Sequence, residues 1–78
     1  MERAYLLLEL TQGADRENLK NAVGQGLPNS LALATFLVPG ELIVHIESTD
    51  MSSLTESITM IAQLEGVTRT TVLVISRT

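Results

Sequence analysis

The chain contains no cysteine and no tryptophan, and only one tyrosine, one phenylalanine and one histidine among its 78 residues. Without cysteine it forms neither disulfides nor thiolate metal sites. Only five residues are Lys or Arg against nine Asp or Glu, so the formal net charge is −4 and no cluster of cations is available to neutralise phosphates. We therefore expect no direct binding to nucleic acid.

Long hydrophobic runs and a signal peptide are also missing, which leaves a cytoplasmic protein without a membrane partner as the expectation. The length predicts a single domain over residues 1–78. A chain this short buries only about 60% of the surface that its unfolded form exposes. Because disulfides are excluded, we expect oligomerisation to supply the missing stability.

The clearest local signal is the stretch Gly66–Ile75, where a glycine precedes a run of threonine and β-branched residues. Gly66 suits the left-handed residue that ends a helix, and the residues after it favour a strand. The preceding stretch predicts a strand over 42–48 and a helix over Asp50–Glu65, with Asp50 as the favoured N-cap and Ser53 with Glu56 as a competing capping box. Apolar residues recur in this helix every three or four positions: Met51, Leu54, Ile58, Ile61 and Leu64.

The first half of the chain predicts the same elements more weakly. A strand is expected over 4–10, then a helix capped by Asp15 that ends near Gly24, then a strand over 31–38. Pro39 and Gly40 form a turn that joins this strand to the next as a hairpin. The order βαββαβ predicts an α+β fold, the ferredoxin-like α/β sandwich, with an antiparallel four-stranded sheet and two helices on one face.

Such a sheet leaves one face open, and the strands here are apolar on both sides. The alternating sets are Leu6, Leu8 and Leu10 against Tyr5 and Leu7; Leu31, Leu33 and Leu37 against Ala32, Ala34, Phe36 and Val38; and Leu73 and Ile75 against Val72 and Val74. Helices cover only one face, and a large exposed apolar patch usually marks an interface. We therefore expect a sheet-to-sheet homodimer related by two-fold symmetry, as in a dimeric α/β barrel.

Two segments of the second half, Leu42–Asp50 and Glu65–Val74, together with the helix between them, resemble the effector-binding (RAM) domain of the Lrp/AsnC, or feast/famine, transcription regulators. The most specific piece is Gly66–Thr70, and Leu27-Pro28 is similar to the family's proline at the end of the first helix. The resemblance implies a ferredoxin-like fold, sheet-to-sheet dimers that assemble into octamer-like rings, and amino-acid effectors bound at the seams between dimers.

The chain departs from that family in two ways. The family places a helix-turn-helix DNA-binding domain before this region, whereas this chain starts at the first strand, so it is similar to the stand-alone form. Co-assembly with a full-length family regulator is then the implied route to transcription regulation. The family's hairpin turn runs glycine, any residue, aromatic, aspartate, whereas this chain has only Gly40-Glu41, with Glu41 in place of the aspartate.

The predicted ligand-binding residues are Gly40, Glu41, Thr68 and Thr70. The turn offers backbone donors and, through Glu41, an acceptor for an ammonium group, while the threonines offer hydroxyls to a carboxylate. The threonines are equally well explained as strand formers on a half-buried sheet. Arg69 either holds an anionic ligand or forms an ordinary salt bridge with Glu65 or with an acid of a neighbouring subunit.

No catalytic residue, metal ligand or cofactor site is predicted. His45 is the only histidine and lacks evident catalytic partners, so packing at the sheet interface is the favoured role. Glu9 and Glu47 fit solvated strand-end acids, and Gly24 and Gly26 close a helix instead of opening one, which excludes a nucleotide-binding loop.

The favoured function is a non-catalytic module that binds an amino-acid-like effector and oligomerises. The alternative is a small dimeric α/β-barrel enzyme with a pocket between sheet and helices. Polar residues that point into the core favour the enzyme, and polar residues at a subunit seam favour the binding module.

Overall fold

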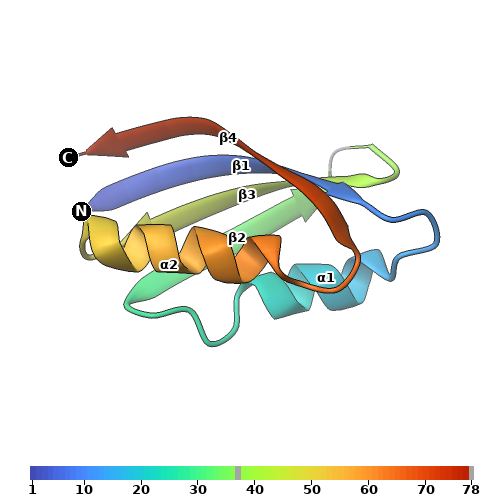
Figure 1. Ribbon diagram of the computed structural model, residues 1–78, viewed down its shortest axis with the longest axis horizontal. Coiled ribbons are helices and arrows are strands. Elements are labelled where there is room, and N and C mark those ends of the chain that lie inside the picture. Colours follow the sequence, from blue (N-terminus) through green and yellow to red (C-terminus); the bar gives the residue numbers. More distant parts are fainter. Residues whose placement is uncertain (37, 78) are drawn as a thin grey trace.

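Four antiparallel strands form one sheet in the order β2-β3-β1-β4, and two helices complete the domain in a computed structural model that describes residues 1–36 and 38–77. The elements are β1 (Glu2–Leu10), α1 (Arg16–Val23), β2 (Ser30–Phe36), β3 (Glu41–Ser48), α2 (Met51–Ala62) and β4 (Val67–Arg77). This small α+β architecture confirms the predicted element order and is compatible with a ferredoxin-like fold. The two chain ends lie at one end of the sheet, opposite the loop between β1 and α1 (Figure 1).

The element boundaries differ from the predictions by a few residues. β1 begins at Glu2 instead of Ala4 because its first residues pair with β3 and β4, which no apolar pattern signals. β2 begins at Ser30 and ends at Phe36, and Leu37, part of that prediction, lies outside the described residues. α2 ends at Ala62, earlier than predicted, and its chain continues into a turn that closes at Gly66.

Capping hydrogen bonds explain where the two helices begin, and a glycine explains the turn that follows α2. The Asp15 side chain accepts a hydrogen bond from the Asn18 backbone N–H at 3.1 Å, and Asp50 accepts one from the Ser53 N–H at 2.7 Å. Asp50 is therefore the N-cap of α2, as predicted, and the competing capping box is not used. Gly66 has a φ of +98°, which favours glycine, and a Cβ at this position would lie 3.2 Å from the Leu19 Cδ1 atom, so a larger residue also needs that side chain to shift.

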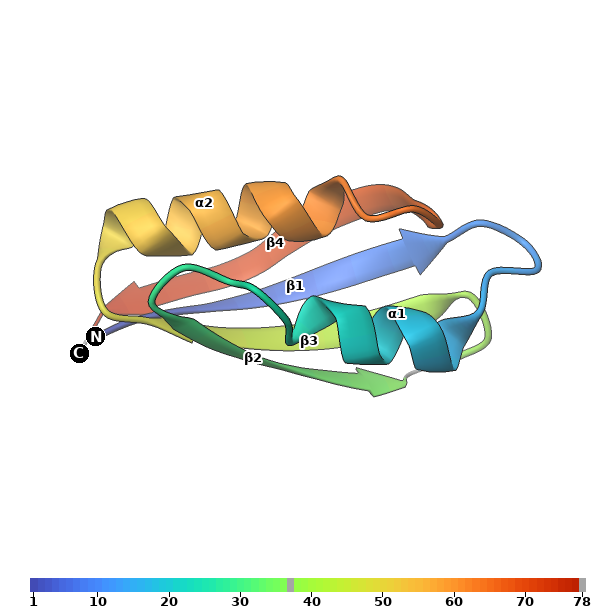
Figure 2. The same ribbon diagram turned by 90° about the horizontal axis from the view of Figure 1, so that it is seen from below.

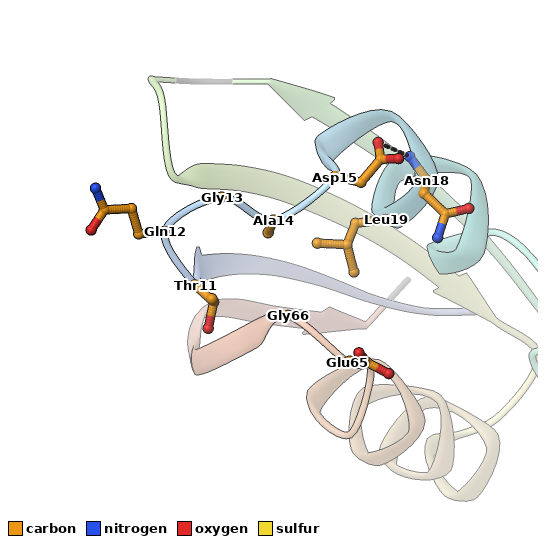
Figure 3. A pocket seen from close by; sticks show the side chains of 9 residues that line it. All are labelled: Thr11, Gln12, Gly13, Ala14, Asp15, Asn18, Leu19, Glu65 and Gly66. Atoms are coloured by element: carbon orange, nitrogen blue, oxygen red, sulfur yellow. Dashed lines mark hydrogen bonds between the residues drawn. The ribbon is translucent and has the colours of Figure 1, made fainter.

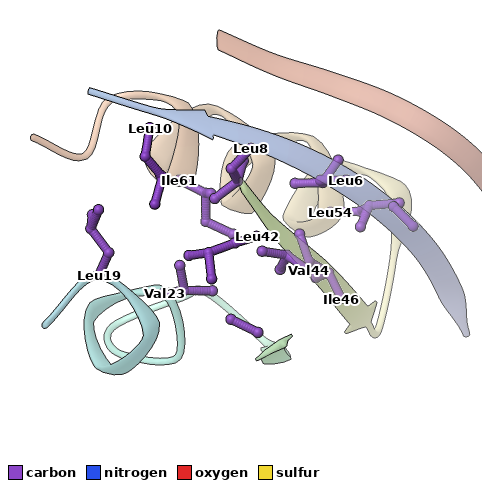
Figure 4. Packing of buried hydrophobic residues seen from close by; sticks show 12 residues of the cluster. Leu6, Leu8, Leu10, Leu19, Val23, Leu42, Val44, Ile46, Leu54 and Ile61 are labelled. Carbon is purple, nitrogen blue, oxygen red and sulfur yellow. The ribbon is translucent and has the colours of Figure 1, made fainter. Parts of the chain in front are cut away.

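The core lies between the sheet and both helices, which cover the same face (Figures 2 and 4). Inward side chains alternate along β1 and β3, and they meet Leu19 and Val23 of α1 and Leu54 and Ile61 of α2. The inward residues of these two strands are Ala4, Leu6, Leu8, Leu10, Leu42, Val44 and Ile46. Met51, Ile58 and Leu64 pack around this cluster, which confirms the predicted apolar stripe of α2.

The predicted face assignment was wrong in β4. Val74 pairs with Tyr5 and Val72 pairs with Leu6, because the register shifts between these two positions. Tyr5 and Leu6 are adjacent and point to opposite faces, so Val72 and Val74 also face opposite sides. Simple alternation from the sequence had placed them on one side, and it fails wherever a bulge adds a residue to one strand.

Three serines are buried beneath α2: Ser48, Ser53 and Ser57. The Ser57 hydroxyl donates to the Ser30 Oγ at 2.9 Å, Ser30 donates to the Pro28 carbonyl at 2.7 Å, and the Ser48 and Ser30 hydroxyls are in hydrogen-bond contact. Because Ser30 gives its proton to Pro28, Ser48 is the donor in the Ser48–Ser30 pair. Ser30 is thus the shared acceptor for two buried hydroxyls.

Replacing Ser30 with alanine leaves the Ser48 and Ser57 hydroxyls buried without an acceptor. We expect Ser30→Ala to lower the free energy of unfolding by about 2 to 4 kcal/mol, since each orphaned buried group costs about 1–3 kcal/mol. Urea denaturation measures the change, with Ser52→Ala, at an exposed position of α2, as the control. Equal midpoints for the two variants would contradict this role.

The pKa of the Asp50 carboxyl is lowered from its ordinary value of 3.8, chiefly by the hydrogen bond that it accepts from the Ser53 backbone N–H. A group whose pKa is lowered by folding stabilises the folded state above its unfolded-state pKa, and this contribution is lost as the pH falls through the folded-state pKa.

We expect Asp50→Asn, which keeps a capping oxygen, to reduce the loss of stability between pH 5 and pH 2 without abolishing the helix. The measurement is urea unfolding across that range. Glu56→Gln at an exposed position of α2 is the matched control, and an identical acid profile for Asp50→Asn and the wild type would refute the assignment.

Candidate functional site

The face of the sheet opposite the helices is uncovered and apolar at its centre. Tyr5 and Leu7 of β1 point to this open face, because Ala4, Leu6 and Leu8 point inward. Their cross-strand partners share the same face, and they form two rows across the sheet: Leu33, His45, Tyr5 and Val74, then Thr35, Ile43, Leu7 and Thr71. Leu33 is 67% exposed and Leu31, beside these rows, is 79% exposed. We call these two rows the apolar band.

His45 lies in the middle of the apolar band. Its ring stacks on Tyr5, with 4.6 Å between the ring centroids and an angle of 12° between the planes. The Nε2 atom is 3.9 Å from Glu47 Oε1, and Leu33 is the partner on the other side in β2. These neighbours place His45 in a packed strand position, which is the role that the sequence favoured for it.

Charged side chains border the apolar band at both ends of the open face. One row places Arg3 opposite Glu47, and the other places Glu9 between Glu41 and Arg69. Arg69 Nε lies 3.6 Å from Glu9 Oε2, an exposed pair of little energetic weight. The predicted salt bridge of Arg69 therefore goes to Glu9 of its own chain instead of to Glu65.

The four predicted ligand-binding residues lie at the same end of the sheet, on either side of the end of β1. Gly40, with a φ of +89°, accepts a hydrogen bond from the Leu10 N–H at 2.8 Å. The Thr68 hydroxyl donates to the Glu9 carbonyl at 3.0 Å. Glu41 faces the open side with Glu9, whereas Thr70 is paired with inward-facing Leu8 and its buried hydroxyl has no partner among the described residues. Glu41 and Thr70 thus belong to opposite faces.

Two hollows lie at this end, on either side of the loop Thr11–Ala14 that connects β1 to α1. The first, about 510 Å³, is bounded by the loop, the start of α1 and the turn at Glu65 and Gly66 (Figure 3). The second, about 420 Å³, lies between the loop, Arg16 and the hairpin turn at Pro39 and Gly40. Of the predicted residues, Gly40 lines the second hollow, and the other three line neither of these two.

Sequence reasoning missed the β1–α1 loop as a site element. Its Thr11 N–H donates to the Gly66 carbonyl at 2.8 Å, so the loop is fixed against the turn that precedes β4. Asp15 and Glu65 give the first hollow a negative border, and Arg16 gives the second a positive one. The signal was present in the sequence, since the run Thr11-Gln12-Gly13 ends a strand at the same sheet end as the hairpin turn.

Within residues 1–36 and 38–77, no group of three or more His, Cys, Asp or Glu side chains is placed to hold a metal ion. Neither helix has the length and apolar character needed to cross a membrane.

Comparison of the chain with models of known protein families and with curated protein sequences found no match.

Proposed function

We propose that the protein is a non-catalytic module that self-associates through the open sheet face and binds an amino-acid-like effector at the sheet end containing the β1–α1 loop. The observation that carries the first part is the apolar band. Four neighbouring strands present leucine, isoleucine, valine and tyrosine to solvent on the face that the helices leave bare. A second copy of the same sheet has the matching shape and apolarity, and a two-fold interface uses one patch twice.

The effector proposal is supported by the opposite charges at the borders of the two hollows. A zwitterion needs an acceptor for its ammonium group and a donor for its carboxylate. Asp15 and Glu65 border one hollow, Arg16 borders the other, and the backbone of the loop and of the hairpin turn at Gly40 lies beside them. Glu41 and Thr68 flank this end, and we propose that they reach the ligand where dimers meet in an octamer-like ring. Thr70, whose hydroxyl is buried on the face opposite Glu41, does not take part.

The regulatory part of the proposal rests on the sequence resemblance. On that resemblance alone, we propose co-assembly with a full-length family regulator through the same surfaces.

One observation favours the alternative, an enzyme with a pocket between sheet and helices. Ser48, Ser53 and Ser57 are polar residues in the core, the feature expected for that class. However, Ser48 and Ser57 bond to Ser30, and no titratable side chain among the described residues hydrogen-bonds to the hydroxyls of Ser30, Ser48 or Ser57. A serine nucleophile needs an adjacent base, so the geometry supports a structural role better.

Leu33→Glu tests self-association. Leu33 is 67% exposed in one copy, so the change leaves the fold intact, but it places a charge on each side of an apolar interface. We expect the dimer dissociation constant to rise at least about 100-fold, measured by sedimentation velocity, with circular dichroism to verify folding. Met60→Glu on α2 carries the same charge change and is the control. A wild-type chain that sediments as a monomer at 100 μM would refute the proposal.

A panel of the natural amino acids tests ligand binding, measured by thermal shift and native mass spectrometry. A ligand at 100 times its dissociation constant stabilises the folded state by about 2.7 kcal/mol. We expect the Glu41→Gln, Thr68→Ala double variant to lose most of that shift, and binding to require the assembled ring. Unchanged binding by this variant, or equal affinity for diluted dimers, would place the site elsewhere.

A further inference from the structure

The apolar band contains the chain's single histidine, a residue type that ordinarily gains or loses its charge between pH 5 and pH 8. In the strand register His45 lies between Leu33 of β2 and Tyr5 of β1, in the middle of the open face. The carboxylates and guanidinium groups of this face lie instead in the rows that border the band. The proposed interface therefore has a group that titrates near neutral pH at its centre.

The surroundings of the imidazole offer little to a positive charge. Its Nε2 atom is shielded from solvent and has no hydrogen-bond partner among the described residues. The Glu47 Oε1 atom is 3.9 Å away, which is beyond hydrogen-bond distance. The His45 side chain as a whole is still 29% exposed, so water solvates an imidazolium as long as the open face is uncovered.

The charged groups that face His45 come from β3 and β1. Glu47 favours the imidazolium, but Arg3 lies opposite Glu47 in the register, so a permanent cation is already beside that carboxylate. The helices lie on the other face of the sheet (Figure 2). The positions of β2 and β4 in the row of His45 and in the two neighbouring rows are uncharged: Leu31, Leu33, Thr35, Thr71, Val74 and Ser76.

We infer that protonation of His45 opposes the packing of the open face against a second copy, so that self-association is controlled by pH. The inference rests on the proposed self-association and adds a regulatory property to that surface. A second copy removes the water that solvates the ring, and the imidazolium is left in an apolar contact without a hydrogen-bonded acceptor. The covered face therefore binds fewer protons than the uncovered face, and association weakens as the pH falls.

The expected size of the effect follows from the number of protons. A two-fold interface contains two copies of His45, so dissociation takes up as many as two protons. We expect the dimer dissociation constant of the wild type to rise about 30- to 100-fold between pH 7.5 and pH 5.5 at constant ionic strength. Sedimentation velocity measures it, and circular dichroism at both pH values verifies that the chain stays folded.

Two variants separate His45 from other titrating groups. His45→Phe keeps an aromatic ring against Tyr5 but does not titrate, and we expect its dissociation constant to change less than about threefold over the same range. Glu47→Gln removes the carboxylate nearest in sequence to the imidazole, and we expect it to keep the pH dependence, because the carboxylate is not the source of the effect.

Proton NMR supplies a second readout, since a chain with one histidine gives one imidazole Cε1–H resonance. Binding linkage is reciprocal, so a face that associates better without a proton also holds that proton less well once it is covered. We expect His45 to stay neutral to a lower pH at a protein concentration that forms the dimer than at one that leaves the chain monomeric.

The outcomes distinguish this inference from the proposal beneath it. A wild-type chain that is monomeric at pH 7.5 and 100 μM overturns the self-association and the pH control together. A dimer of equal strength at both pH values, or a pH dependence that survives in His45→Phe, overturns the role of His45 alone. A dimer that tightens as the pH falls also overturns it, because the imidazolium then has a favourable partner in the second copy.

Discussion

The structure depends on one constraint: two short helices cover a single face of a four-stranded sheet whose strands are apolar on both sides. Inward residues of β1 and β3 are fully buried against α1 and α2. Outward residues of the sheet have no cover of their own, and Tyr5 of β1, Leu31 and Leu33 of β2 and Val74 of β4 stay exposed. The hydrophobic effect acts equally on both faces, so the bare face supports association.

The core is small, and its polar part consists of a few buried serine hydroxyls. The hydroxyls of Ser30, Ser48 and Ser57 hydrogen-bond to one another between α2 and the sheet. Buried hydroxyls of this kind specify one packing, because each has a single acceptor. The opposite end of the sheet is built from backbone contacts, with Leu10 bonded to Gly40 and Thr11 to Gly66.

These backbone bonds explain why the proposed binding end and the proposed dimer face are connected. β1 is central in the sheet, and its last residues fix the hairpin turn on one side and the start of β4 on the other. Glu9 and Glu41 stand where the apolar band ends and the hollows begin. A partner copy on the open face would therefore lie next to the proposed ligand end, which gives a physical route for coupling between assembly and binding.

The sequence by itself determined the element order, the N-cap at Asp50, the glycine at position 66 and the inward stripe of α2, because each depends on local chemistry and periodicity. The structure places Gly40, Glu41, Thr68 and Thr70 at one sheet end but sets Glu41 and Thr70 on opposite faces, which the sequence did not show. Only the tertiary structure decided the facing of Val72 and Val74, since a bulge depends on the partner strand. The same holds for the serine cluster and the hollows beside Thr11–Ala14. Those features arise from residues far apart in the chain, whose meeting no local pattern encodes.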